Sequence, residues 1–204
     1  MRGLMTGLEP TDLDPDPIRQ LSAWLTDAER AGIPLANAFA LATADADGQA
    51  SVRFVLLRGL DAHGLRWYTN RASRKGRDVA VNPWASAAFW WPALERQARV
   101  SGPVRLLPED ESTAYWRTRP RGSQLSATIS EQGREIGSRA ELEARVAELD
   151  AVAPGDLPLP PTWGGYLMIP RLVELWQGRP DRLHDRVEYR RGADESWHRR
   201  RLQP

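Results

Sequence analysis

The stretch that decides the fold runs from Ala38 to Thr69 and reads AFALATADADGQASVRFVLLRGLDAHGLRWYT. Three β-prone runs at 38–44, 50–58 and 65–69 are separated by the turn-forming segments DADG and DAHG. Strands that alternate with short turns of this kind form antiparallel hairpins. The stretch therefore predicts an antiparallel meander.

Further strands and helices are expected on both sides of this meander. Asp16 followed by Pro17 is typical of a helix start, and Ser138 with Glu141 forms a capping box at another. A proline-rich segment at 151–161 is interpreted as an extended surface connection. The helices are expected at 17–31, 74–81, 108–118 and 139–149, and the further strands at 85–91, 97–106, 165–169, 172–176, 186–190 and 197–202.

About eight strands in hairpin order with inserted helices predict a mainly β protein with flanking helices, folded as a closed or partly closed antiparallel barrel. The length of 204 residues fits one domain, 1–204, with residues 1–14 as a flexible N-terminus. No cysteine is present, which excludes a disulfide framework, a thiol nucleophile and a cysteine-based metal site, and no metal site is expected. Nine tryptophans predict extensive packing and an aromatic ligand pocket.

Charge and hydropathy narrow the class of partner. The net charge of +1, from 28 basic and 27 acidic residues, does not favour nucleic acid. A basic tail (Arg190, Arg191 and Arg199 to Arg201) is interpreted as a solvated strand pair, with a polyanion site as the alternative. The sequence contains no apolar run long enough for a membrane span or a signal peptide. We therefore expect a cytoplasmic protein without a nucleic-acid or membrane partner.

A short C-terminal stretch is the first candidate for a ligand site. Trp176-Gln-Gly178 and Arg182-Leu-His-Asp-Arg186 place two arginines, an imidazole and a tryptophan close together in sequence. Arginine presents a fixed fork of donors that carboxylate or phosphate oxygens accept in pairs. The ligand is expected to be anionic and aromatic.

Two further segments are candidates for phosphate sites. Ser73-Arg-Lys-Gly-Arg77 combines a helix start with a hydroxyl and three cations, and a solvated basic helix is the alternative. Arg53 lies in an apolar run, so it must face solvent or meet an anion. Tyr115 and Arg119 are four residues apart on a predicted helix, and Ser123 is expected to turn back toward them. The alternative for this second segment is an ordinary helix end, with Ser123 as the next cap.

Taken together, these segments resemble one family, the FMN-dependent pyridoxine and pyridoxamine 5'-phosphate oxidases. The resemblance covers nearly the whole chain. Its strongest parts are Tyr68-Thr-Asn70 with Ser73-Arg-Lys-Gly76, Asn82-Pro83, Leu94-Glu-Arg-Gln97, Arg119-Pro120 with Ser123-Gln124, Trp163-Gly-Gly165, and Trp176-Gln-Gly178 with Arg182-Leu-His-Asp-Arg186.

The resemblance implies a split β-barrel homodimer with FMN at the subunit interface. It also implies an oxidase that converts pyridoxamine or pyridoxine 5'-phosphate to pyridoxal 5'-phosphate, with molecular oxygen as acceptor and hydrogen peroxide as product. The residues implied to contact FMN are Arg53, Phe54, Val55, Leu56, Tyr68, Thr69, Arg74, Lys75, Gln97, Gln132, Gly133, Trp176 and Arg186. The residues implied to bind substrate are Arg58, Tyr115, Arg119, Ser123, Arg182 and His184, the last two at the reacting carbon. For His184 the alternative is a structural hydrogen bond to a carboxylate such as Asp185.

Four departures from the family pattern bear on the substrate. Arg58 stands where a lysine is usual, Gly133 where a flavin-contacting serine is common, and Ser126 and Thr128 where glycine and tryptophan are usual. The N-terminus also lacks the Arg-x-x-Tyr segment expected to cover the substrate. Two alternatives therefore stay open: a related flavin oxidase of the phenazine type acting on another reduced aromatic, and a non-catalytic flavin-binding protein.

Overall fold

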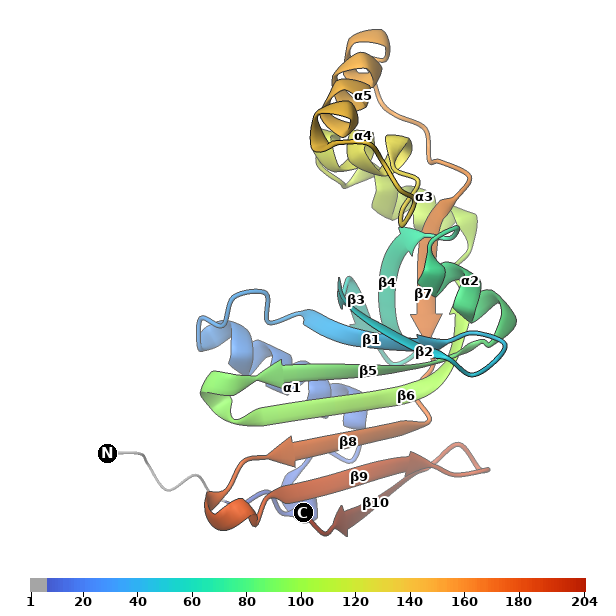
Figure 1. Ribbon diagram of the computed structural model, residues 1–204. Coiled ribbons are helices and arrows are strands. Elements are labelled where there is room, and N and C mark those ends of the chain that lie inside the picture. The colour runs from blue at the N-terminus through green and yellow to red at the C-terminus, as the bar shows by residue number, and fades with distance from the viewer. Residues whose placement is uncertain (1–6) are drawn as a thin grey trace.

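Ten strands, each paired with its neighbours in antiparallel fashion, form the body of the protein in the computed structural model, which describes residues 7–204 (Figure 1). They are β1 (Ala38–Ala44), β2 (Ala50–Leu56), β3 (Gly59–Asp61), β4 (Gly64–Asn70), β5 (Trp84–Trp91), β6 (Arg96–Leu106), β7 (Trp163–Met168), β8 (Leu172–Gln177), β9 (Asp185–Arg191) and β10 (Trp197–Leu202). Seven of them lie in the order β10-β9-β8-β6-β5-β1-β2, and β3, β4 and β7 form a wing beside this path.

The sheet divides along β6. The first half of β6 pairs with β8 from Arg96 to Ser101, and its last residues pair with β7 from Val104 onward. Gly102 lies at the branch point, where the chain between β7 and β8 crosses so closely that a Cβ atom on Gly102 would lie 1.9 Å from the carbonyl oxygen of Ile169. One long strand therefore holds both halves of a split barrel, as predicted.

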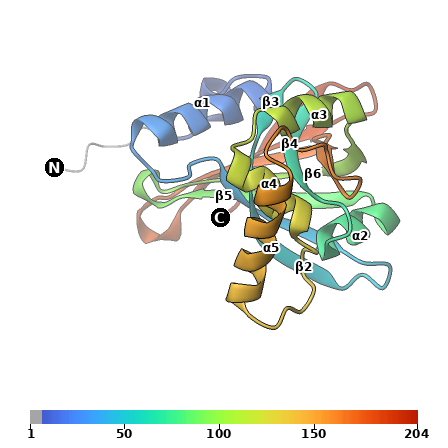
Figure 2. The same cartoon turned by 90° about the horizontal axis from the view of Figure 1, so that it is seen from above.

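The helices lie around this sheet (Figure 1). Helix α1 starts after Asp16, whose side chain accepts a hydrogen bond from the backbone N–H of Ile18, and it buries Leu21 and Trp24 in the main core. Figure 2 shows α1 and α2 on different sides of the molecule. The helices are α1 (Pro17–Arg30), α2 (Arg74–Val81), α3 (Glu109–Arg117), α4 (Arg121–Ile129) and α5 (Arg139–Val152), with short 3-10 turns at Pro10–Asp12, Pro92–Leu94 and Pro180–Arg182.

Helices α3, α4 and α5 stack at one end of the molecule, far from strands β8 to β10 (Figure 1). They surround a second, smaller core that contains Trp116, Leu125, Leu157 and Trp163. Because Leu157 lies in the proline-rich connection and Trp163 begins β7, this small core ties the helices to the wing of the sheet.

Most of the predicted elements are confirmed, and the differences are local. Helix α4 and the short strand β3 were not predicted, so the strand number is higher than the expected eight or so. Ser73 does precede α2, but its hydroxyl donates to the Asn70 carbonyl oxygen instead of accepting from a backbone N–H of the helix. Helix α3 ends at Arg117, so Arg119 lies beyond it, and the residue that caps α4 is Pro120 rather than Ser123.

The segment before α1 lies against the C-terminal strands. The backbone N–H of Leu8 donates to Asp185, and Arg199 donates to the carbonyl oxygens of Pro10 and Leu13. The expectation of a flexible N-terminus concerned residues 1–14, of which residues 1–6 lie outside the described part of the chain. No helix between residues 7 and 204 has both the length and the hydropathy needed to cross a membrane.

Replacing Gly102 with alanine is expected to destabilise the fold. The new methyl group would overlap the Ile169 carbonyl, so the crossing backbone must move, which costs about 2 kcal/mol. Urea unfolding monitored by circular dichroism measures this loss.

Gly122 is the matched control, because a Cβ atom there meets nothing within 4 Å inside a helix. Gly122→Ala should be neutral or gain about 0.5 kcal/mol. Equal stabilities of the two variants would contradict the close crossing at the branch point.

Candidate functional site

A cavity of about 400 Å³ lies between β2, β4 and α3 and is closed at one side by the segment that follows α4. Four cations line it, and none of the described residues that line it is a carboxylate. The cavity brings together eight of the residues implied to bind FMN and three of those implied to bind substrate. Its lining residues are Arg53, Phe54, Val55, Leu56, Arg58, Tyr68, Thr69, Lys75, Tyr115, Arg119, Gln132 and Trp163.

Lys75 is the buried cation of this site. Its ammonium group donates to Thr69 Oγ1 at 3.0 Å, Ser73 Oγ at 3.1 Å and Gln132 Oε1 at 3.0 Å, which are all neutral oxygens. Burial, and to a lesser extent the positive charge of Arg53, lower the pKa of Lys75 from 10.5 to about 8. A lysine held this way lacks a compensating negative charge, and an anionic ligand would supply it.

Arg53 is held in a fixed position on β2. Its Nη1 donates to the Leu41 carbonyl oxygen at 3.1 Å and to Thr43 Oγ1 at 2.8 Å, and its Nη2 donates to Ser51 Oγ at 2.7 Å. Its guanidinium lies 3.9 Å from the buried carboxylate of Asp78. Of the two alternatives for Arg53, facing solvent or meeting an anion, the structure therefore favours the second, and the anion within the chain is the buried carboxylate of Asp78.

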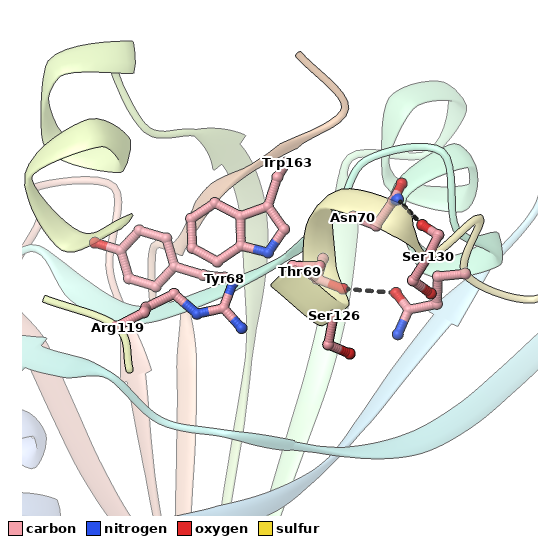
Figure 3. A pocket seen from close by; sticks show the side chains of 9 residues that line it. Tyr68, Thr69, Asn70, Arg119, Ser126, Ser130 and Trp163 are labelled. Carbon is pink, nitrogen blue, oxygen red and sulfur yellow. Dashed lines mark hydrogen bonds between the residues drawn. The ribbon is translucent and has the colours of Figure 1, made fainter. Parts of the chain in front are cut away.

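Arg119 lies on a stack of aromatic rings. Tyr68, Tyr115 and Trp163 are nearly parallel, with 3.9 Å between the centroids of the two tyrosine rings and 5.5 Å between those of Tyr68 and Trp163. The Arg119 guanidinium carbon lies 4.7 Å from the Trp163 centroid, as the close-up in Figure 3 illustrates. Burial lowers the pKa of Arg119, and its buried Nη1 has no hydrogen-bond partner among residues 7–204. One donor of this arginine therefore has no partner among the described residues.

A smaller cavity of about 230 Å³ adjoins the first and shares its aromatic wall (Figure 3). It adds three polar residues that were not predicted: Asn70, Ser126 and Ser130. Asn70 donates to the Ser130 carbonyl oxygen at 3.2 Å, so β4 and the end of α4 are joined here. Trp163 was not predicted as a site residue either, although its motif, Trp-Gly-Gly, was noted.

Several predicted residues form a second cluster on a different part of the sheet. Gln97 lies opposite Trp176 on β8, which lies opposite Arg186 on β9, so the three side chains share one face. Trp90 belongs to the same row. None of the predicted residues in this cluster lines the cavity. The chain therefore presents its predicted site as two separate halves.

His184 completes the second cluster. Its ring lies 4.6 Å from that of Trp176, and its Nδ1 accepts a hydrogen bond from the backbone N–H of Arg179 at 3.1 Å. Asp185 pairs instead with Arg179 and Arg201, so it is not the partner of this imidazole. Because Nδ1 accepts, the proton of the neutral ring lies on Nε2, which leaves that atom able to donate.

Four other predicted residues lie at the margins. Arg182 is exposed and has a left-handed backbone at φ 61°. Arg74 is exposed, 4.0 Å from Asp45, and does not line the cavity. Gly133 lines a neighbouring cavity beside Gln132, and Ser123 lies in the first turn of α4. Between residues 7 and 204, no cluster of three acidic or histidine side chains is placed to hold a metal ion.

Two family models match the chain. Residues 25–153 match the model described as pyridoxamine 5'-phosphate oxidase. Residues 163–204 match the model described as the pyridoxine 5'-phosphate oxidase C-terminal dimerisation region, which contains the second cluster apart from Trp90 and Gln97.

Relatives and solved structures agree with these matches. The chain is 49% identical over 201 residues to a pyridoxine/pyridoxamine 5'-phosphate oxidase of Cupriavidus metallidurans. The matched region covers 98% of this chain and 95% of that protein. A Rubrobacter xylanophilus protein of the same name is 50% identical over 199 residues, covering 97% and 91%. The structure of PhzG from Burkholderia lata 383 in complex with tetrahydrophenazine-1-carboxylic acid has a TM-score of 0.92 and 35% identity, covering 99% and 100%. An FMN-binding protein of Nostoc punctiforme has the same fold at a TM-score of 0.76 and 21% identity, covering 94% and 100%.

Replacing Lys75 with methionine is expected to stabilise the protein when no anion is bound. Methionine fills similar space without a charge to desolvate, and the oxygens left behind keep other contacts, such as that between Thr69 and Gln132. We expect a gain of about 1 kcal/mol at pH 7, or roughly 2–4 °C in Tm for a chain of this size.

The sign of the pH dependence follows from the lowered pKa of Lys75. Because folding moves this pKa from 10.5 to about 8, the charged lysine costs stability at every pH below about 8. The cost declines as the pH rises from there toward 10.5, so the advantage of the methionine variant should shrink over that window. Urea unfolding of both proteins in phosphate-free buffer measures this, and an advantage that is constant up to pH 10.5 would contradict it.

Proposed function

The chain belongs to the pyridoxamine 5'-phosphate oxidase family, and on that premise we propose that it oxidises pyridoxamine 5'-phosphate or pyridoxine 5'-phosphate to pyridoxal 5'-phosphate. Oxygen accepts the electrons and hydrogen peroxide is released. The observation that carries the proposal is the cavity lined by four cations and no described carboxylate. One phosphate group on the cofactor and one on the substrate would neutralise these charges.

The cofactor is FMN, in keeping with the family. The residues present fit it, because buried Lys75 has only neutral partners and Arg53 is already fixed beside it. The β2 residues Phe54 to Leu56 add an apolar edge to the same cavity. Lys75 and Arg53 would hold the anionic part of the cofactor, with Arg74 outside. When bound, FMN supplies a two-electron acceptor that oxygen can reoxidise.

The substrate phosphate is assigned to the other end of the cavity. Arg119 has a buried donor there that lacks a hydrogen-bond partner among residues 7–204. Burial lowers the pKa of Arg119, and the nearby positive charge of Arg58 also lowers it. Tyr115 lies on the same wall, and the Arg119 guanidinium lies over the rings of Trp116 and Trp163, which hold it in position. A phosphate held at a fixed point sets the distance between the substrate ring and the cofactor, which is the main contribution of a protein to such a transfer.

We further propose that a second copy of the chain supplies Arg182 and His184. These residues lie outside the cavity of their own chain, within the region that matches the dimerisation model. The sheet face that carries the row of Trp90, Gln97 and Trp176 also carries Phe54. Phe54 and Trp90 are 76% and 51% accessible, and a second subunit would cover them. His184 would then donate from Nε2 to the reacting substituent, and Arg182 would orient that substituent.

A phenazine-type oxidase is the second candidate function, supported by the close structural match to PhzG. The ligand in that structure is, by its name, a carboxylic acid and carries no phosphate. With FMN bound in either case, a carboxylate would bring a single negative charge to Arg58 and Arg119, whereas a phosphate brings up to two. The phosphorylated vitamer therefore suits the site better.

The decisive experiment offers both substrate classes to the purified protein. After loading with FMN, the protein should form pyridoxal 5'-phosphate and peroxide from pyridoxamine or pyridoxine 5'-phosphate in air, measured by aldehyde absorbance and a coupled peroxide assay. Turnover of a reduced phenazine carboxylic acid alone would favour the second candidate. Binding of FMN without turnover of either would leave a flavin-binding protein and overturn the proposal.

Mixed dimers test the composite site. Arg119→Ala and His184→Ala are each expected to lose most activity, but co-expression should restore about a quarter of the wild-type activity, because half the dimers then contain one intact site. The matched control combines Arg119→Ala with Lys75→Met, two changes in the same half of the site, which cannot complement each other. Equal recovery in both mixtures would contradict a site shared between subunits.

A further inference from the structure

A buried hydrogen-bonded chain connects helix α2 to the cation on β2. We propose that Asp78 is a positioning residue, which acts through Thr43 to fix the Arg53 guanidinium for FMN. This role rests on the FMN site proposed above. Thr43 and Asp78 were not among the site residues predicted from the sequence.

The contacts are short and shielded from water. Thr43 Oγ1 donates to Asp78 Oδ2 at 2.6 Å and accepts from Arg53 Nη1 at 2.8 Å. Thr43 and Asp78 are 3% and 4% exposed, and the Asp78 carboxylate lies 3.9 Å from Arg53 Nη2. Thr43 is therefore a relay between a buried carboxylate and a largely buried guanidinium.

The carboxylate decides which way the threonine hydroxyl points. An ionised carboxylate only accepts hydrogen bonds, so the single hydroxyl proton of Thr43 must point to Asp78. The lone pairs of the oxygen then face Arg53, which can only donate. An asparagine at position 78 presents an amide that can donate to Thr43 and turn the hydroxyl proton toward the guanidinium. The arrangement thus depends on the charge at position 78 and not only on its shape.

Asp78 pairs with Arg53 and not with Lys75. The two residues are three positions apart on α2, and both belong to its buried face. Nevertheless, the ion pair that Asp78 forms among the described residues is with Arg53, whereas Lys75 contacts neutral oxygens. The helix therefore fixes one cation with a carboxylate and keeps the other available for the cofactor.

The test measures the affinity for FMN from the quenching of flavin fluorescence when FMN binds to the apoprotein. This measurement needs no turnover. Asp78→Asn and Thr43→Val should each weaken FMN binding by about tenfold or more, since each removes the charged hydrogen-bond relay. The double variant should be no weaker than the worse single variant by more than about twofold, because both changes break one chain. Thr43→Ser keeps the hydroxyl and should retain affinity.

Two simpler roles for Asp78 predict different results. If Asp78 acted only through its long-range charge, its removal would tighten the binding of an anionic cofactor. If it acted only as a strut between α2 and β1, unfolding temperatures would fall while the affinity of the folded protein stayed the same. Either result overturns the proposal. Should Asp78→Asn fail to fold, the contrast between Thr43→Val and Thr43→Ser decides the matter.

Asp27→Asn is the control variant. It breaks a different aspartate–arginine pair, with Arg96 at 2.8 Å, outside the cavity, and should leave FMN affinity unchanged. The outcome is separable from that of the proposed function. A wild-type protein that binds FMN but oxidises no vitamer refutes the oxidase and still allows the affinity comparison, whereas unchanged affinities in an active oxidase refute only the role of Asp78.

Discussion

Strand β6 must pair with three neighbours, and the arrangement of both half-sites follows from this constraint. No room exists for β7 and β8 to lie side by side along it, so they divide it at Gly102, where the connecting chain passes too closely for any side chain. The wing built by β7 and β4 brings Tyr68 and Trp163 to the helical end of the molecule. The strands beyond β6 lead away from it and carry Trp176 and Arg186. A split sheet therefore separates the residues that one ligand would need together.

Within the cavity, fixed positive charge is the governing physical feature. Buried cations are costly unless they have partners, and the chain treats its cations differently. Arg53 is satisfied by Thr43, Ser51 and a backbone carbonyl, Arg119 rests on aromatic rings, and Lys75 has only neutral oxygens. The energetic cost of burying these charges falls mainly on Lys75, which explains the direction of its pKa shift. Among these cations, Lys75 is therefore the one that the protein alone stabilises least.

The sequence predicted local structure well where the signal is local. The turns DADG and DAHG and the cap at Asp16 are confirmed, because each acts within a few residues. Helix α4 was missed because the segment after Arg119 was interpreted as a turn that brings Ser123 back toward Tyr115 and Arg119, whereas Pro120 precedes a helix. The branch at Gly102 and the chain from Asp78 to Arg53 depend on residues distant in sequence. The position of His184 outside the cavity could not be predicted from the sequence either, since sequence order does not say to which half of a site a residue belongs.

The separation of the two clusters has a thermodynamic consequence. If one flavin contacts Lys75 of one subunit and Trp176 of another, cofactor binding and subunit association share the same free energy. Linkage then requires that each strengthens the other by the same factor. Diluting the protein would release flavin, and removing flavin would loosen the dimer, without any change in either surface. The row of Trp90, Gln97 and Trp176, in which Trp90 is exposed and the other two are partly buried, would thus make the oligomeric state of the protein a sensor of cofactor supply.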